Sequence, residues 1–166
     1  KLLDESIKYF GSSTILASIE ATKINGQFIC VTNSGREETN LNVLDWAKKV
    51  EDKGVSEIII TSINYEGMGN GFDLELITKL NKSISIPFII SGGYGKLEHI
   101  KEILKFNNLS GISIASALHY SVKNSLKINS NDYNEGNYDF LNKRKKYKNF
   151  EKTTISKIRK FINLNI

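Results

Sequence analysis

Apolar runs of strand length alternate with segments of helical periodicity along most of this chain, and this alternation limits the possible folds more than any other feature. The runs that read as strands buried on both faces are Thr14–Ile19, Glu57–Ile63, Pro87–Ser91 and Gly111–Ala115. Strands of this kind, separated by helices, are typical of a parallel sheet with helical crossover connections. The sequence therefore predicts an α/β fold with four βα units, ending at about residue 120.

The segments between these runs have apolar residues at helical spacing, and several end at glycine. Helices are predicted over residues 2–10, 41–53, 74–80 and 97–104, with Asn40 as the N-cap of the second. A short strand, Phe28–Thr32, follows the turn signal Asn25-Gly26. A last amphipathic helix is predicted from about Glu151.

Two regions follow from this pattern: a domain over residues 1–128, and a polar linker with a basic C-terminal helix over residues 129–166. The net charge of +5 is concentrated near the end of the chain, where residues 143–146 read KRKK. A basic run can bind nucleic acid or an anionic membrane. No groove-binding or base-stacking motif accompanies it, so we expect a solvated lysine-rich end and no nucleic-acid partner.

Several classes of protein are excluded by composition. The single cysteine, Cys30, permits neither an intramolecular disulfide nor a cysteine zinc site. No apolar run approaches the ~20 residues that span a bilayer, and the first residues lack a secretory layout. We expect a cytoplasmic protein with no metal site, no cofactor and no membrane span.

Small residues follow two neighbouring predicted strands, where sites form in parallel α/β folds. Ser91-Gly92-Gly93 follows the third strand, and Ala115-Ser116 follows the fourth. Glycines let backbone N–H groups approach an anion, and a helix N-terminus adds the positive end of its dipole. These turns are candidates for a shared phosphate cradle, although glycines at such positions can also serve the turn alone.

Glu20 stands at the end of the first apolar run, where burying a carboxylate is costly. It is either a general acid or base or an ordinary solvated residue, and the pattern alone does not separate the two. Thr61 lies near the end of the second predicted strand, and Gly67 lies in the loop that follows it.

Two longer stretches carry a family resemblance. Residues 57–73 read EIIITSINYEGMGNGFD and residues 86–99 read IPFIISGGYGKLEH, with supporting matches in Thr32–Arg36, Asp45-Trp46 and Ala115-Ser116 before His119. Together they resemble the cyclase subunit of imidazole glycerol phosphate synthase, in collinear order over residues 1–128.

This resemblance implies a TIM (βα)8 barrel, of which the chain matches strands five to eight, the C-terminal (βα)4 half. It implies a lyase of the histidine pathway that takes ammonia from a glutaminase partner to cyclise and cleave a bis-phosphorylated ribosyl intermediate. The implied roles are Glu20 as catalytic acid, Glu57 in the ammonia gate, and a substrate and phosphate site at Ser34, Thr61, Gly67, Gly92, Gly93, Ala115 and Ser116.

Departures from the family pattern point to alternatives. Glu20 replaces an aspartate, and Asn64, Glu66 and Met68 stand where the family usually has Asp, Asp and Thr. The family's general base lies on strand one, outside the resemblance. The alternatives are a paralogue that delivers ammonia for sugar amidation in surface polysaccharide (lipopolysaccharide) biosynthesis, and a non-catalytic partner of a glutaminase.

Overall fold

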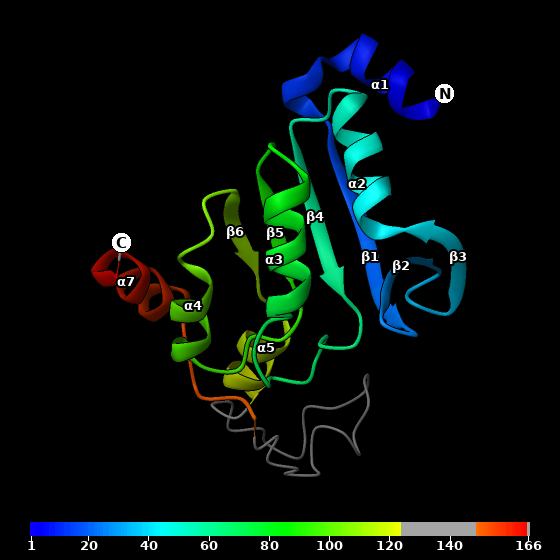
Figure 1. Cartoon of the computed structure of the whole chain (residues 1–166). Coiled ribbons are helices and arrows are strands. Elements are labelled where there is room, and N and C mark those ends of the chain that lie inside the picture. Colours follow the sequence, from blue (N-terminus) through cyan, green and yellow to red (C-terminus); the bar gives the residue numbers. More distant parts are fainter. Residues whose placement is uncertain (124–148, 166) are drawn as a thin grey trace, which may run out of the picture.

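The computed structural model describes residues 1–123 and 149–165, which form one six-stranded sheet with helices packed on it (Figure 1). The strand order is β3-β2-β1-β4-β5-β6, so β3 and β6 are edge strands and the sheet is open. The strands are β1 (Leu16–Ile24), β2 (Gln27–Thr32), β3 (Glu37–Asn42), β4 (Glu57–Ser62), β5 (Phe88–Ser91) and β6 (Leu109–Ser113). The helices are α1 (Leu2–Phe10), η1 (Ser12–Thr14), α2 (Val43–Asp52), α3 (Leu74–Ser83), α4 (Leu97–Ile103), α5 (Ser116–Lys123) and α7 (Ile155–Asn165).

The four strands predicted from the apolar runs, β1, β4, β5 and β6, are parallel and adjacent. Helices α2 and α3 cover one face of the sheet, and this face holds the core. In β4, Ile58 and Ile60 are fully buried, whereas Ile59, which points to the opposite face, is only partly buried. The predicted βα units are therefore confirmed, with helices on one face of an open parallel sheet.

The antiparallel part of the sheet differs from the prediction. The first strand does not end at Glu20: β1 continues to Ile24 and forms a hairpin with β2. Strand β3 was not predicted, because its sequence EETNLN is polar, yet it pairs with β2 at the edge of the sheet. The helix that follows therefore begins later, and its N-cap is Asn42 instead of Asn40, since Asn42 Oδ1 accepts from the N–H of Leu44 at 2.9 Å.

The predicted C-terminal helix is present as α7, which lies beside α4 (Figure 1). Its Ile158 belongs to the same hydrophobic cluster as the sheet and α3. The predicted linker, residues 129–142, and the KRKK run lie outside the described residues. None of the helices in the described ranges has the length and apolar character needed to cross a membrane.

Candidate phosphate-binding site

The carboxyl ends of the four parallel strands bring several predicted site residues to one level of the sheet. In the strand registers, Glu20 pairs with Thr61, Thr61 pairs with Ser91, and Ser91 pairs with Ser113. Residues at matching positions of parallel strands point to the same face. This row of polar side chains lies on the face opposite α2 and α3, at the edge where βα loops begin.

An open hollow lies at the β5 and β6 end of this row. It contains five of the predicted phosphate-site residues: Gly67, Gly92, Gly93, Ala115 and Ser116. The other lining residues are Glu66, Ser91, Tyr94, Ser113, Ile114, Ala117 and Phe150. Three loops that lie far apart in sequence therefore meet at one pocket.

The backbone at Gly93 requires glycine. Its φ is +102°, and an added Cβ would lie 2.0 Å from the carbonyl oxygen of Gly71. That contact is part of a tight pairing between the two loops, in which the N–H of Gly71 donates to the carbonyl oxygen of Gly93 at 2.9 Å. Gly67, with φ +70°, faces α5, and its added Cβ would lie 3.9 Å from Ser116 Oγ. The glycines bring the backbone of two loops close to each other and to the start of α5.

The described lining of the pocket has no positively charged side chain, so the donors that face an anion there are backbone N–H groups and hydroxyls. Among its described lining residues, Glu66 has the single ionisable carboxylate and no Lys or Arg is present. Helix α5 begins at Ser116 within the lining, so its first N–H groups and the positive end of its dipole are directed toward the pocket. Backbone N–H groups and the hydroxyls of Ser91, Ser113 and Ser116 are the donors that a phosphate would meet.

The loop that carries Gly67 is fixed at its far end by Asp73. This carboxylate is buried, accepts from the N–H of Leu76 at 3.0 Å as the N-cap of α3, and accepts from Ser62 Oγ at 2.9 Å. Ser62 is the last residue of β4. The two ends of the loop are thus joined by a buried hydrogen bond, which sets where the loop returns to the sheet.

Glu20 and two other predicted residues form a separate group at the same edge. Glu20 is partly buried, and its Oε2 accepts from the N–H of Gly35 at 3.0 Å. Ser34 lies in the same turn after β2, with φ +59°. Thr61 lies on β4, which stands between the strand of Glu20 and the strand of Ser91. Glu20 is therefore two strand spacings, or about 10 Å, from Ser91, which lines the pocket. Glu20, Ser34 and Thr61 do not line the hollow.

Asn64 links β1 to the loop after β4. Its Oδ1 accepts from Thr22 Oγ1 at 2.8 Å and from the N–H of Lys23 at 3.0 Å. The amide therefore ties the end of β1, which carries Glu20, to the loop after β4, which carries Gly67.

Glu57 lies at the other end of the sheet. It is the first residue of β4, and its carboxylate accepts a hydrogen bond from Ser110 Oγ on β6. This is the amino end of the strands, remote from the pocket.

Two buried side chains support the Gly92–Gly95 turn. Burial raises the pKa of Tyr94, whose hydroxyl lies 3.4 Å from Thr153 Oγ1. Burial also lowers the pKa of His99, whose Nδ1 accepts from the N–H of Gly95 at 3.2 Å. His99 is therefore a packing residue of the turn. Within the described ranges, no three His, Cys, Asp or Glu side chains are grouped so that they could hold a metal ion.

Comparison with known proteins decides the family. The profile of the family described as histidine biosynthesis protein matches residues 1–124. The chain belongs to this family. It is 42% identical over 105 residues to the imidazole glycerol phosphate synthase subunit HisF of Sulfurisphaera tokodaii, which covers 63% of the chain and 42% of that relative.

Two further HisF subunits give a similar alignment. Identity is 39% over 119 residues with the Saccharolobus solfataricus subunit and 37% over 121 residues with the Bacillus cereus subunit. Each alignment covers 72% of the chain. The aligned part is 47% of the first subunit and 48% of the second. The chain thus spans about half the length of the HisF subunits it matches. Its open, mostly parallel sheet with alternating helices is a partial TIM-barrel fold of this family.

The lining residues that were not predicted as site residues are Tyr94, Ser113, Ile114, Ala117 and Phe150, and Glu66 was noticed only as a departure from the family. Tyr94 directly follows the predicted Gly92-Gly93 pair, so its position in sequence was a usable signal. Phe150 lies outside the family match, and nothing local in its sequence indicates that it reaches the pocket.

Proposed function

We propose that the hollow between the three βα loops binds one phosphate group of a phosphorylated small-molecule substrate. The observation that carries this proposal is that Gly67, Gly93 and Ser116 line one pocket. Backbone N–H groups and a helix N-terminus together are a common solution for binding phosphate. The pocket is open and lies at the carboxyl edge of the sheet, which suits an end group of a larger substrate.

The chemistry we propose is that of a cyclase-like subunit of the imidazole glycerol phosphate synthase type. In this proposal a glutaminase partner supplies ammonia, Glu57 takes part in its entry at the amino end of the sheet, and Glu20 is the acid in ring closure and cleavage. The HisF relatives support the cyclase assignment, and the position of Glu20 at the carboxyl edge is compatible with a role there.

A second candidate is ammonia delivery for sugar amidation, or a non-catalytic role beside a glutaminase. It is favoured by the length and the hydrogen bond of the Glu20 side chain. Glu20 is longer than the family's aspartate, and a displacement of about 1 Å can cost about 100-fold in rate. Glu20 is also held by the N–H of Gly35. Under this second candidate, turnover of the histidine-pathway ribonucleotide with ammonia is expected to be weak or absent, with partial recovery in Glu20→Asp. Turnover at a rate normal for the family would refute this second candidate.

The phosphate site itself is tested by Ser116→Asp. An aspartate in the first turn of α5 favours the helix because it complements the dipole, so the fold should be preserved. The same carboxylate repels a phosphate in the pocket, and affinity for inorganic phosphate, measured by calorimetry, should fall at least about tenfold.

Ser116→Asn is the matched control, since it has nearly the same shape and no charge. It should bind phosphate within about threefold of the unmodified chain. Equal phosphate affinity in the Asp and Asn variants would mean that the anion does not bind at this pocket.

A further inference from the structure

His99 lies against the glycine-rich loops that line the pocket. Its side chain is buried, with 7% of its surface exposed, and its Nδ1 accepts from the N–H of Gly95 at 3.2 Å. A Cβ at Gly71 would lie 3.8 Å from Cδ2 and 3.9 Å from Nε2 of the same ring. One imidazole therefore adjoins both the loop after β4, which carries Gly67, and the turn after β5, which carries Gly93.

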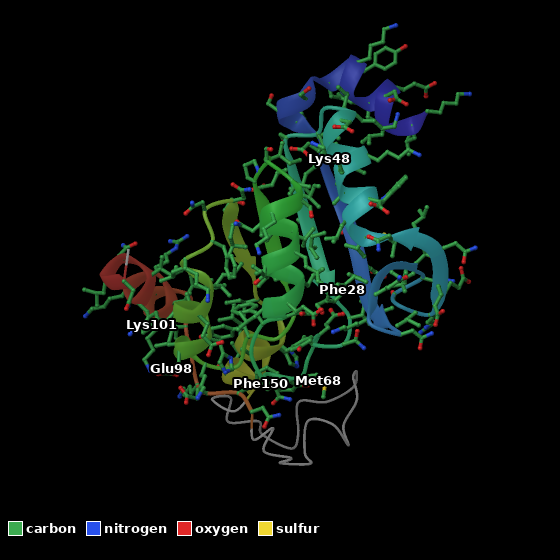
Figure 2. The ribbon with its side chains drawn as sticks, viewed as in Figure 1. Phe28, Lys48, Met68, Glu98, Lys101 and Phe150 are labelled. Atoms are coloured by element: carbon green, nitrogen blue, oxygen red, sulfur yellow. The ribbon has the colours of Figure 1, made fainter. Side chains whose placement is uncertain are left out.

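Three segments of the chain meet at Gly95. A Cβ there would lie 2.0 Å from the carbonyl oxygen of Gly69 and 2.4 Å from that of Asn149. The carbonyl oxygen of Gly95 accepts from the N–H of Glu151 at 2.9 Å. Phe150, between these two residues of the C-terminal segment, lines the pocket and is labelled at the lower end of the sheet in Figure 2. The position of Gly95 therefore sets the position of this wall of the pocket as well as that of its own turn.

The hydrogen bond from Gly95 needs a neutral imidazole. A neutral ring has one nitrogen that accepts, whereas both nitrogens of the protonated ring are donors. Protonation of Nδ1 would set two donors against each other and would leave a buried N–H without its acceptor. The bond therefore exists only while His99 is neutral.

The charged groups around the ring come from two elements. Lys96, Glu98 and Glu102 belong to α4 and its N-cap, and Glu151 belongs to the C-terminal segment. Burial has the largest effect and lowers the pKa of His99; the three carboxylates oppose this effect, and Lys96 adds to it. The accepting form is thus the form present at neutral pH.

We propose that His99 is a positioning residue of the phosphate site, whose neutral imidazole holds the Gly95 turn in the arrangement that binds the anion. The proposal rests on the proposed phosphate site. Protonation of His99 releases Gly95, so the turn that carries Gly93 and the segment that carries Phe150 lose their fixed positions together. Anion affinity then falls as the solution becomes acidic, which is opposite to the electrostatic effect of an added positive charge.

Inorganic sulfate is the probe, because it has the shape and charge of a phosphate dianion and does not titrate between pH 5 and pH 7.5. Calorimetry on the full chain should show an affinity about fivefold lower at pH 5 than at pH 7.5, the size expected for coupling through one hydrogen bond. His99→Asn puts an amide oxygen near the position of Nδ1 and cannot be protonated in this range. It should bind sulfate within about twofold of the unmodified chain at pH 7.5 and keep that affinity at pH 5.

His99→Phe and His119→Gln are the matched controls. Phenylalanine keeps an aromatic ring but offers no acceptor to Gly95, so the sulfate affinity should be about fivefold lower at both pH values. An affinity equal to that of the unmodified chain would mean that the ring only fills space, and would overturn the proposal. His119 is the other histidine of the chain and lies on α5. His119→Gln should keep the pH dependence, and its loss in that variant would equally overturn the role of His99.

A further measurement needs no variant. The effects of a ligand and a proton on each other are reciprocal, so saturating sulfate should lower the pKa of His99 in the unmodified chain, followed by NMR of the ring protons. An anion that acts only through its charge would raise this pKa. A raised or unchanged pKa on sulfate binding would overturn the inference even if none of the variants folds.

The outcomes distinguish this inference from the function on which it rests. If the unmodified chain binds neither sulfate nor inorganic phosphate at pH 7.5, the phosphate site itself is refuted. If it binds sulfate equally well at both pH values, or if His99→Asn loses affinity at pH 5 as the unmodified chain does, the pocket stands and the role of His99 is overturned.

Discussion

Replacing Asp73 with alanine should destabilise the chain far more than an ordinary loss of a helix cap. Asp73 Oδ1 caps α3 through the N–H of Leu76, and Oδ2 accepts from the buried Ser62 hydroxyl. Loss of a cap costs about 1 kcal/mol, and a buried hydroxyl left without its partner costs about 2 kcal/mol more. The free energy of unfolding should therefore fall by about 3 kcal/mol, a decrease of about 9 °C in Tm for a chain of this size.

Asn42→Ala provides the comparison, because the Asn42 side chain caps α2 by accepting from two backbone donors, the N–H groups of Leu44 and Asp45. It should cost about 1 kcal/mol, or about 3 °C. Urea unfolding followed by circular dichroism measures both variants.

Ser62→Ala, alone and combined with Asp73→Ala, completes a double-mutant cycle. The two side chains should show a coupling of about 1 to 2 kcal/mol. If Asp73→Ala and Asn42→Ala cost the same within about 0.5 kcal/mol, the buried bond does not fix the loop that carries Gly67.

Three further perturbations have outcomes that follow from single contacts. Glu66→Gln should raise the affinity for inorganic phosphate about threefold, because it removes a like charge from exposed surroundings. Glu5→Gln, at an exposed position at the opposite end of the sheet, should leave the phosphate affinity unchanged. Equal effects of the two substitutions would mean that Glu66 is not part of the site. His99 is held neutral as an acceptor with a lowered pKa, so its contribution to stability is present above the ordinary value of 6.5 and is lost as pH falls through the folded value. In His99→Gln the free energy of unfolding should therefore depend less on pH below 6.5. An unchanged pH dependence would contradict this. Burial raises the pKa of Cys30 to about 11, so a thiol reagent at pH 8 should modify it only in denaturant, and rapid labelling of the folded chain would refute its burial.

The parallel strands and their order along the chain could be predicted because their signal is local. Ile58, Ile60 and Ile90 lie in continuous apolar runs, and an apolar run of strand length needs no partner-specific information to be recognised. The same locality explains why the glycine turns were found: Gly92 and Gly93 stand directly after such a run.

Strand β3 could not be predicted for the opposite reason. Residues 37–42 are polar, and they become a strand because β2 has an unpaired edge beside them. That pairing moves the helix start from Asn40 to Asn42. This pairing is a tertiary effect, which neither the β propensity nor the periodicity of residues 37–42 predicts.

Glu20 lies at the carboxyl edge of the parallel sheet, although the predicted end of its strand was wrong. The apolar pattern stops at Glu20, but the strand continues to Ile24 because β2 supplies a hairpin partner. The parallel pairing with β4 does end next to it, at Ala21, so Glu20 still lies at the carboxyl edge. Phe150 is the complementary case, since only the folded chain brings it to the pocket.

The central claim is tested most directly by titrating inorganic phosphate into the ¹⁵N-labelled chain and following its backbone amide resonances. The amides of Gly93, Ala115 and Ser116 should shift together, with one shared dissociation constant. Shifts confined to the basic residues of α7, such as Lys157 and Arg159, with unchanged amides at the two turns, would contradict it.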